Sequence, residues 1–145
     1  MLQLTKRTEY GLIAMTHLAS NEGRVVSVRE IAEHYPVPKR LLAEVLKDLN
    51  REGLVESQRG AHGGYELARP AESITVGDVV AALERHPSLT SCESLGAYKA
   101  RACDVEPVCP IRGPIHQLRQ GIWKLLQRTT LSDLARPNTS PARVG

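Results

Sequence analysis

The sequence predicts a mainly α-helical fold with one small β-hairpin. Apolar residues recur at helical spacing in several stretches, which are separated by proline, glycine and helix-capping residues. One short segment is folded back on itself by a glycine-rich tip, a pattern typical of a hairpin. The core has to be built from Leu, Val, Ile and Ala, because the chain has no Phe and a single Trp, and this composition favours helices.

The first predicted helix covers residues 8–19, and either Thr5 or Thr8 is placed to cap its start. Glu9 lies in its first turn, where a carboxylate interacts favourably with the helix dipole, so a solvated surface acid is the simplest interpretation of this residue. The apolar residues expected to define the buried side are Leu12, Ile13, Met15, Leu18 and Ala19.

A second, short helix and a longer third helix follow, joined by a tight turn. Ser27 and Glu30 form the S-x-x-E pattern of a capping box, and Pro36 ends the second helix at the preceding residue. Pro38 suits the first position of the third helix, which ends near Gly53. Its apolar stripe is Leu41, Leu42, Val45, Leu46 and Leu49. The pair predicts a helix-turn-helix, whose second member enters the DNA major groove, although a plain helical hairpin would show the same pattern.

A β-hairpin directly after this helix pair is typical of a wing. Residues 54–57 and 65–68 are the predicted strands, and the tip between them carries Arg59 and His62 among glycines. Glycine lets the backbone approach a phosphate closely, and an arginine there can enter a narrow minor groove. A surface hairpin with a solvated arginine is the alternative. The candidate DNA-binding residues are Ser27, Pro38, Lys39, Arg40, Arg59, Gly60, His62 and Gly63.

The remainder of the chain predicts two further helices around an irregular loop, and TTLSDL at residues 129–134 is placed to cap and form one last short helical turn. Residues 76–86 have an apolar face, and residues 111–127 form a longer amphipathic stretch with little core left to join, so we expect a second copy of the chain to cover it. The expected divisions are a winged helix-turn-helix DNA-binding domain at 1–86, a cysteine-bearing loop at 87–110, a dimerisation helix at 111–134 and a disordered tail at 135–145.

The cysteines of the chain all fall in that loop, at Cys92, Cys103 and Cys109. Their spacing is too wide for the Cys-x-x-Cys of a zinc knuckle. Long loops without periodicity are uncommon in compact domains unless they are functional. Three soft thiolate ligands on such a loop indicate a metal or redox site, whereas three unrelated thiols are the plain alternative.

Charge and hydropathy restrict the class of protein. No apolar run approaches the roughly 20 residues of a membrane span, and the first residues are too polar for a signal peptide, so we expect a cytoplasmic protein without a membrane partner. In that reducing compartment an odd number of cysteines argues against a structural disulfide framework. The net charge of +3 is compatible with a nucleic-acid partner. The sequence has no Cys-x-x-Cys, phosphate loop or nucleophile–base pattern, so an enzyme is not expected.

With these motifs the sequence resembles the family of winged-helix iron-sulfur transcriptional regulators that includes IscR, NsrR and RirA. The resemblance covers residues 2–134 and rests on LTKRTEYGLIAM at the start, the stretch 31–84, the three cysteines and TLSDL near the end. Its most specific part is R-G-x-x-G-G-Y at residues 59–65. It implies a repressor-like regulator that binds a pseudo-palindromic double-stranded DNA operator as a homodimer.

The resemblance also implies an iron-sulfur cluster, either 2Fe-2S or 4Fe-4S, held by Cys92, Cys103 and Cys109. The cluster would sense nitric oxide, iron or redox state. A cluster-free regulator that uses thiol–disulfide or zinc chemistry is the alternative.

The fourth ligand differs within the family, and this sequence indicates which type it resembles. Arg112 stands where IscR, the iron-sulfur cluster assembly regulator, has its histidine ligand. An arginine does not ligate iron. Glu9 matches the carboxylate that, in the nitric-oxide sensors, reaches across the dimer, so the partner's Glu9 is the expected fourth ligand. His34 and His116 are weaker candidates and are more simply surface histidines.

Overall fold

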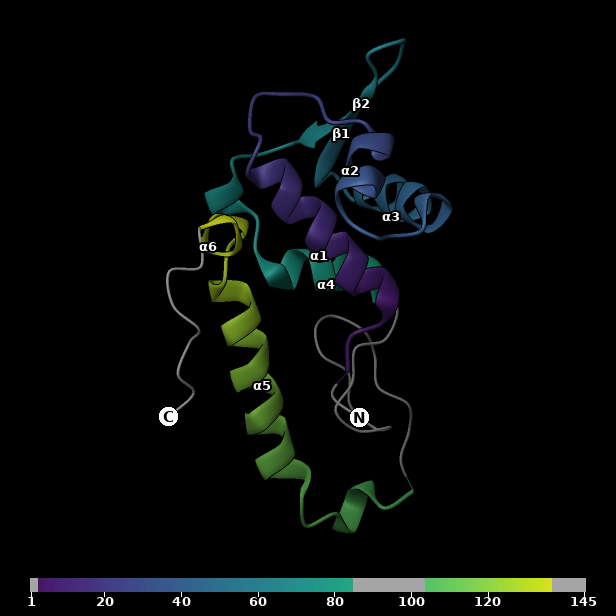
Figure 1. The fold of residues 1–145 in the computed structure, drawn as a ribbon. Coiled ribbons are helices and arrows are strands. Elements are labelled where there is room, and N and C mark those ends of the chain that lie inside the picture. Colours follow the sequence, from purple (N-terminus) through teal and green to yellow (C-terminus); the bar gives the residue numbers. More distant parts are fainter. Residues whose placement is uncertain (1–2, 85–103, 137–145) are drawn as a thin grey trace.

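The computed structural model describes residues 3–84 and 104–136, and its elements confirm the mainly helical fold with a two-stranded hairpin (Figure 1). In chain order they are α1 (Lys6–Ala19), α2 (Val28–His34), α3 (Lys39–Arg51), β1 (Val55–Gln58), β2 (Gly64–Leu67), the 3-10 turn η1 (Ala71–Ser73), α4 (Val76–Leu83), the 3-10 turn η2 (Glu106–Val108), α5 (Arg112–Arg128) and α6 (Leu131–Ala135).

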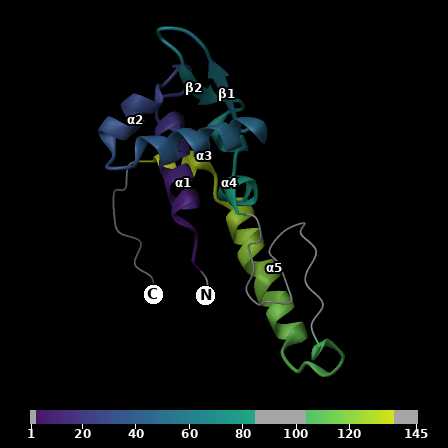
Figure 2. The same ribbon diagram turned by 90° about the vertical axis from the view of Figure 1, so that its right-hand side faces the viewer.

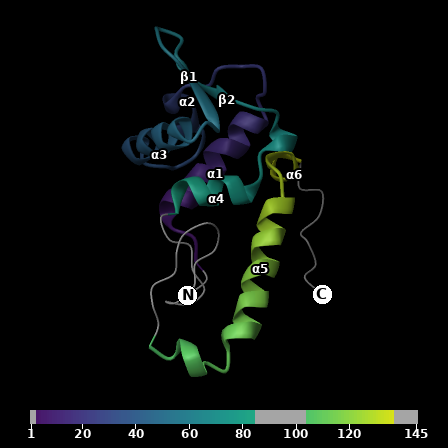
Figure 3. The ribbon, with the colours of Figure 1, turned by 180° about the vertical axis from the view of Figure 1, so that it is seen from behind.

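One apolar core joins the helices α1, α2, α3, α4 and α6 with the hairpin. Its fully buried large side chains include Met15, Leu18, Ile31, Leu42, Leu46, Leu49, Ile74 and Leu131. Figure 3 shows α4 crossing in front of α1, α3 to the left of them, and α6 beside the end of α1 that is nearer the hairpin. The core side of α3 is as predicted, apart from Leu41, which is half-buried.

The first helix differs from its prediction in its start and in part of its buried side. It begins at Lys6, and Thr5 is its N-cap, with its hydroxyl oxygen accepting from the Thr8 amide at 3.3 Å. The residues of α1 that face the core are Gly11, Ala14, Met15 and Leu18. Of the other predicted residues, Leu12 and Ala19 are partly buried and pack against the core, whereas Ile13 is half-exposed. Core packing against α3 and α4 selects the face that carries the small residues.

The helix-turn-helix forms as predicted, with corrections at both helix starts. Ser27 caps α2, its Oγ accepting from the Glu30 amide at 3.0 Å. The Glu30 carboxylate does not return to the backbone of Ser27, as a capping box requires, because it binds Arg24 and His17 instead. Pro38 is the N-cap of α3 rather than its first residue, because its ψ of 118° is not helical.

The hairpin pairs Val55 with Leu67. Its strands are each shifted by one residue from the predicted ranges 54–57 and 65–68. It is attached to the segment before α2 by two backbone hydrogen bonds, from the Val26 amide to the Tyr65 carbonyl at 2.9 Å and from the Tyr65 amide to the Val26 carbonyl at 2.8 Å. Gly64 permits this crossing, because a Cβ atom there would lie 2.2 Å from the Val26 carbonyl oxygen. The hairpin is therefore fixed relative to the helix-turn-helix.

Helix α5 leaves the core and carries no buried residue (Figures 1 and 2). Its C-terminal end is attached to the start of α4, where the Val76 amide donates to the Thr129 carbonyl at 2.8 Å. The chain then returns to the core in α6, where Leu131 is completely buried and its amide donates to Ile74 at 2.9 Å. Residues 111–134 thus contain two helices with different surroundings, and α6 extends to Ala135, into the segment expected to be a tail.

Some predictions fall on residues that the structure does not describe. Cys92, Cys103 and the tail beyond Arg136 lie outside the described ranges. At the end of the expected loop, η2 is a short 3-10 turn rather than irregular chain. No helix within the described ranges is long and apolar enough to cross a membrane.

Candidate nucleic-acid interface

The outward side of α3 is basic at both ends. Lys39 and Arg40 lie in the first turn, and Lys47 and Arg51 follow two and three turns later on the exposed side. The Arg40 side chain is 95% exposed and has only a long ion pair with Glu44, at 3.7 Å. Because Leu42, Val45, Leu46 and Leu49 occupy the opposite side, the helix turns its cations away from the core. This arrangement suits a helix that lies against a polyanion.

The hairpin tip carries the other predicted DNA-binding residues. Arg59, Gly60 and His62 are exposed, and Gly63 is half-buried. Gly60 has a φ of +116°, and its carbonyl accepts from the Gly63 amide at 3.0 Å, which closes the turn. A Cβ at Gly63 would lie 2.5 Å from the Gln58 carbonyl oxygen. The two glycines therefore fix the shape of the tip, which Figures 1 and 3 show projecting beyond α2 and α3.

Within residues 3–84 and 104–136, no ion pair engages Lys39, Lys47 or Arg59. By contrast, the basic residues around α2 are neutralised: Arg24 pairs with Glu30 at 2.7 Å and Arg29 pairs with Glu33 at 2.7 Å. Unpaired cations are thus found on the outer side of α3 and at the hairpin tip. A nucleic-acid backbone would supply the missing negative charge.

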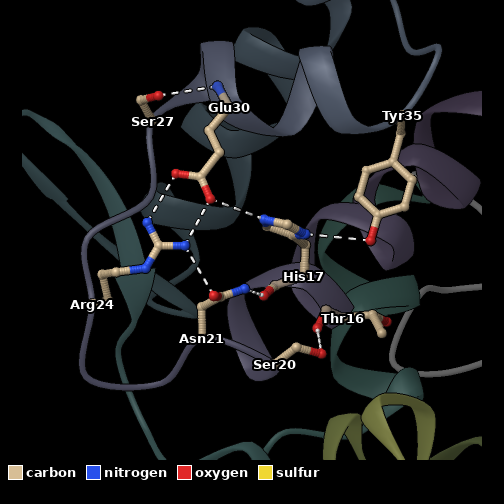
Figure 4. Close-up of polar contacts among 8 residues, drawn as sticks. All are labelled: Thr16, His17, Ser20, Asn21, Arg24, Ser27, Glu30 and Tyr35. Atoms are coloured by element: carbon tan, nitrogen blue, oxygen red, sulfur yellow. Dashed lines mark hydrogen bonds and ion pairs between the residues drawn. The ribbon is translucent and has the colours of Figure 1, made fainter. Parts of the chain in front are cut away.

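A polar cluster holds α2 against the end of α1 (Figure 4). The Glu30 carboxylate accepts from Arg24 and lies 3.4 Å from Nε2 of the buried His17, whose Nδ1 is 3.3 Å from the Tyr35 hydroxyl. Hydrogen bonds from Arg24 lower the pKa of Glu30 to about 2, against a smaller opposing effect of burial. Asn21 joins the cluster by donating to the His17 carbonyl at 2.8 Å. The cluster therefore orients Ser27 and α2 relative to α1.

The structure places one of the three predicted thiolates. Cys109 is a free, half-buried cysteine between η2 and the start of α5. Glu9 lies in the first turn of α1, where its carboxylate is 38% exposed and pairs with Lys6 at 2.6 Å. Among the residues described, no group of three or more His, Cys, Asp or Glu side chains is arranged to hold a metal ion. With Cys92 and Cys103 outside those ranges, the predicted ligand set is not assembled in the part of the chain that the structure describes.

The other residues weighed as ligands have different surroundings. Arg112 is the first residue of α5 and is exposed. His34 is exposed at the end of α2 and its ring lies 4.6 Å from that of Tyr35. His116 contacts Arg119 and Gln120 along α5, at 2.7 and 2.9 Å.

Two basic residues of the surface are absent from the predicted DNA-binding set. Lys47 and Arg51 share the exposed side of α3 with Arg40, because they follow it by seven and eleven residues. Helical periodicity counted outward from Arg40 could have identified both.

Comparison with known proteins agrees with this geometry. Residues 4–137 match the model of the Rrf2 family, described as iron-dependent transcriptional regulators. The fold resembles that of CymR, the global cysteine regulator of B. subtilis, with a TM-score of 0.75 and 30% identity over 93% of this chain and 97% of that one.

Two further solved structures are similar over nearly their whole length. The oxidized form of Staphylococcus aureus CymR has a TM-score of 0.73 and 29% identity, over 95% of this chain and 99% of that one. T. potens IscR has a TM-score of 0.69 and 30% identity, over 99% and 93%. With its helix-turn-helix, its hairpin wing and this match over nearly all residues, the chain belongs to the Rrf2 family of winged-helix, DNA-binding transcriptional regulators.

Proposed function

We propose that the chain is a homodimeric repressor whose binding to a pseudo-palindromic operator is controlled by an iron-sulfur cluster in its cysteine segment, defined as residues 87–110. The observation that carries the proposal is a basic surface on α3 and the wing, in which Lys39, Lys47 and Arg59 have no ion pair among the described residues, together with three cysteines gathered in one other segment. In this proposal the protein has no enzymatic activity, and it binds its DNA operator in the cytoplasm.

The DNA contacts follow from the exposed cations. Lys39 and Arg40, at the start of α3, are placed to reach base edges in the major groove. Arg59 would enter the minor groove, where narrow A/T-rich stretches have the strongest negative potential. The remaining contacts would go to the sugar-phosphate backbone, from Ser27, Pro38, Gly60, His62 and Gly63.

Dimerisation would use the apolar stripe of α5. Ile111, Leu118 and Leu125 recur every seven residues and are 54%, 53% and 65% exposed, so they line one side of the helix in contact with solvent. Burying such a stripe against a second copy is favourable by roughly 25 cal/mol per Å² of apolar surface. A symmetric dimer would then present two α3 helices about 34 Å apart, one DNA turn, to the two halves of the operator.

The donor set fits an iron-sulfur cluster by its chemistry. Cys92, Cys103 and Cys109 would supply thiolates, and the partner's Glu9 would supply a carboxylate, for which the 38% exposed side chain of Glu9 is accessible. When bound, the cluster would supply reactivity towards nitric oxide, oxygen or loss of iron. The residues themselves would tie the cysteine segment of one subunit to α1 of the other.

The similarity to CymR favours a second candidate, a cluster-free regulator controlled by its thiols. One of the similar structures is the oxidized form of CymR, at 29% identity over 95% of this chain. In that case two of the three cysteines would form a reversible disulfide, or all three would bind zinc.

Anaerobic purification followed by treatment with ferrous iron and sulfide separates these candidates. The cluster proposal predicts a brown protein with visible absorption, bound iron and acid-labile sulfide, and a loss of most of this signal in Cys109→Ser. Glu9→Ala should keep the colour but bleach faster in air. Protein that stays colourless and instead gains a disulfide on oxidation, or contains zinc, would rule out the cluster and leave the thiol candidate.

A further inference from the structure

Glu84, the last residue of the first described range, holds the first turn of α1. Its Oε1 accepts from the Thr5 amide at 2.9 Å, from the Thr5 hydroxyl at 2.9 Å and from the Thr8 hydroxyl at 2.6 Å. Thr5 is the N-cap of α1 and Thr8 is completely buried. Three donors on one carboxylate oxygen are charge-assisted hydrogen bonds, which are stronger than neutral ones. The C-terminal end of α4 is therefore tied to the N-terminal end of α1, although 79 residues separate Thr5 and Glu84.

The protonation state of Glu84 agrees with this role. Burial raises the pKa of this carboxyl, but the hydrogen bonds from Thr8 and Thr5 outweigh it, so the pKa lies below its usual range. The group is ionised at neutral pH and acts only as an acceptor. A neutral replacement would keep the shape of the contact but weaken all three bonds.

The same turn of α1 is bonded to the recognition helix. The Arg7 guanidinium forms an ion pair with Asp48 of α3, and neither side chain is more than 35% exposed. Arg7 also lies 4.0 Å from Glu44. Next to these groups, α1 has a glycine at position 11, where a Cβ would lie 2.3 Å from Leu83 of α4. Arg7, Asp48 and Leu83 line one cleft of about 600 Å³, so α1, α3 and α4 meet at this point.

We propose that Glu84 is a positioning residue. Through its hydrogen bonds to the first turn of α1, a change in the cysteine segment would alter the position of α3. This inference rests on the proposed function. Glu84 precedes Cys92 by eight residues in the sequence, and Glu9 lies in the turn that Glu84 holds. A change in the state of the cysteines would act on α1 at Thr5 and Thr8, and Arg7 would pass the displacement to Asp48. The dimer would have two states, and both the cysteine segment and DNA bound at α3 would favour one over the other. The coupling is the resulting free-energy difference.

The test compares Glu84→Ala and Glu84→Gln with the parent and with Glu22→Ala as a matched control. Glu22 also uses a carboxylate oxygen to hold a distant segment, accepting from the Ala71 amide at 3.1 Å, but it lies at the other end of α1. Affinity for a labelled duplex, obtained by selection from random DNA, is measured for metal-free reduced protein and for protein treated with ferrous iron and sulfide, or with diamide. The ratio of the two affinities is the readout, because a merely structural contact would change both affinities alike.

The parent ratio should fall in the range of about 5 to 150 that is usual for allosteric coupling. Glu84→Ala should bring it close to one, Glu84→Gln to an intermediate value, and Glu22→Ala should leave it unchanged. A parent ratio that persists in both Glu84 variants would overturn the inference while leaving the proposed function intact. A parent that binds DNA equally in both states would overturn the sensing function and this inference together. If Glu84→Ala does not fold, Glu84→Gln decides.

A double-mutant cycle tests the route through α3. Asp48→Asn should also reduce the ratio, and the double variant Glu84→Gln with Asp48→Asn should lose no more than the more damaging single variant. If the two reductions multiply instead, Glu84 and Asp48 act independently and the proposed route is wrong.

Discussion

The guanidinium of Arg24 donates two hydrogen bonds to the carboxylate of Glu30, at 2.9 and 2.7 Å, and so fixes the loop before α2 to the first turn of that helix. Because the charged form of Glu30 is favoured in the folded protein, its pKa falls from 4.5 to about 2. A depressed carboxyl pKa contributes stability that is complete above pH 4.5 and is lost as the pH falls through about 2.

This relationship gives the first prediction. Glu30→Gln should lower the free energy of unfolding at pH 7 and should cost progressively less below pH 4.5, as measured by urea denaturation between pH 7 and pH 3. Glu33→Gln is the control, because Glu33 pairs only with Arg29 on the surface and should change stability by less than about 1 kcal/mol at any pH. An equal cost of Glu30→Gln at pH 7 and pH 3 would show that its charge is not what holds the loop.

The second prediction concerns the attachment of the wing. Gly64→Ala should destabilise the protein by roughly 1–3 kcal/mol, because its Cβ would overlap the Val26 carbonyl oxygen at 2.2 Å. It should also weaken DNA binding by displacing the wing. Gly113→Ala has nothing within 4 Å of the added atom and should change stability by no more than about 0.5 kcal/mol. Thermal or urea unfolding checks both variants, and equal stabilities would refute the close crossing.

The third prediction concerns the wing tip. Arg59→Ala should weaken operator binding and reduce the slope of log affinity against log salt by roughly 0.9, the amount expected when one phosphate is no longer neutralised. Arg136→Ala removes an exposed arginine just after α6 that pairs with Asp133 at 3.8 Å, and it should leave both quantities unchanged. Fluorescence anisotropy at several salt concentrations measures the slope. If Arg59→Ala binds with the parent affinity and slope, Arg59 does not contact DNA.

The fourth prediction concerns the apolar stripe of α5. Leu125→Glu should convert the dimer into a monomer, because a carboxylate would be buried without a partner within the stripe. Gln120→Glu, on the opposite side of the same helix, should remain dimeric. Sedimentation velocity distinguishes the two species. A dimeric Leu125→Glu protein would move the subunit interface away from this stripe.

The sequence predicts the helices of this protein well where the signals are local. Ser27 caps α2, three residues before the Glu30 amide from which it accepts. Contacts between distant residues were not predictable in this way. The carboxylate of Glu30 binds Arg24 and His17 instead of the expected backbone amide of Ser27. Glu84 and Thr5 are far apart in the sequence and meet only in the folded chain.

The same distinction applies to the candidate site. The glycine motif at the wing and the cations at the start of α3 were recognisable from spacing alone. The need for glycine at position 64 was not, since it arises from the Val26 carbonyl of another segment. The burial of Leu131 was also unpredictable, because a five-residue helix has too few positions to show which side it buries.

If the cysteine segment controls DNA binding, operator affinity must differ between the two states of its cysteines. Operator affinity is measured by anisotropy for the parent protein and for Cys109→Ser, each in the metal-free reduced state and after treatment with ferrous iron and sulfide under anaerobic conditions. The account predicts at least a roughly fivefold difference between the two states of the parent. It also predicts the same affinity in both states for Cys109→Ser. A parent whose affinity does not change between the two states would contradict it.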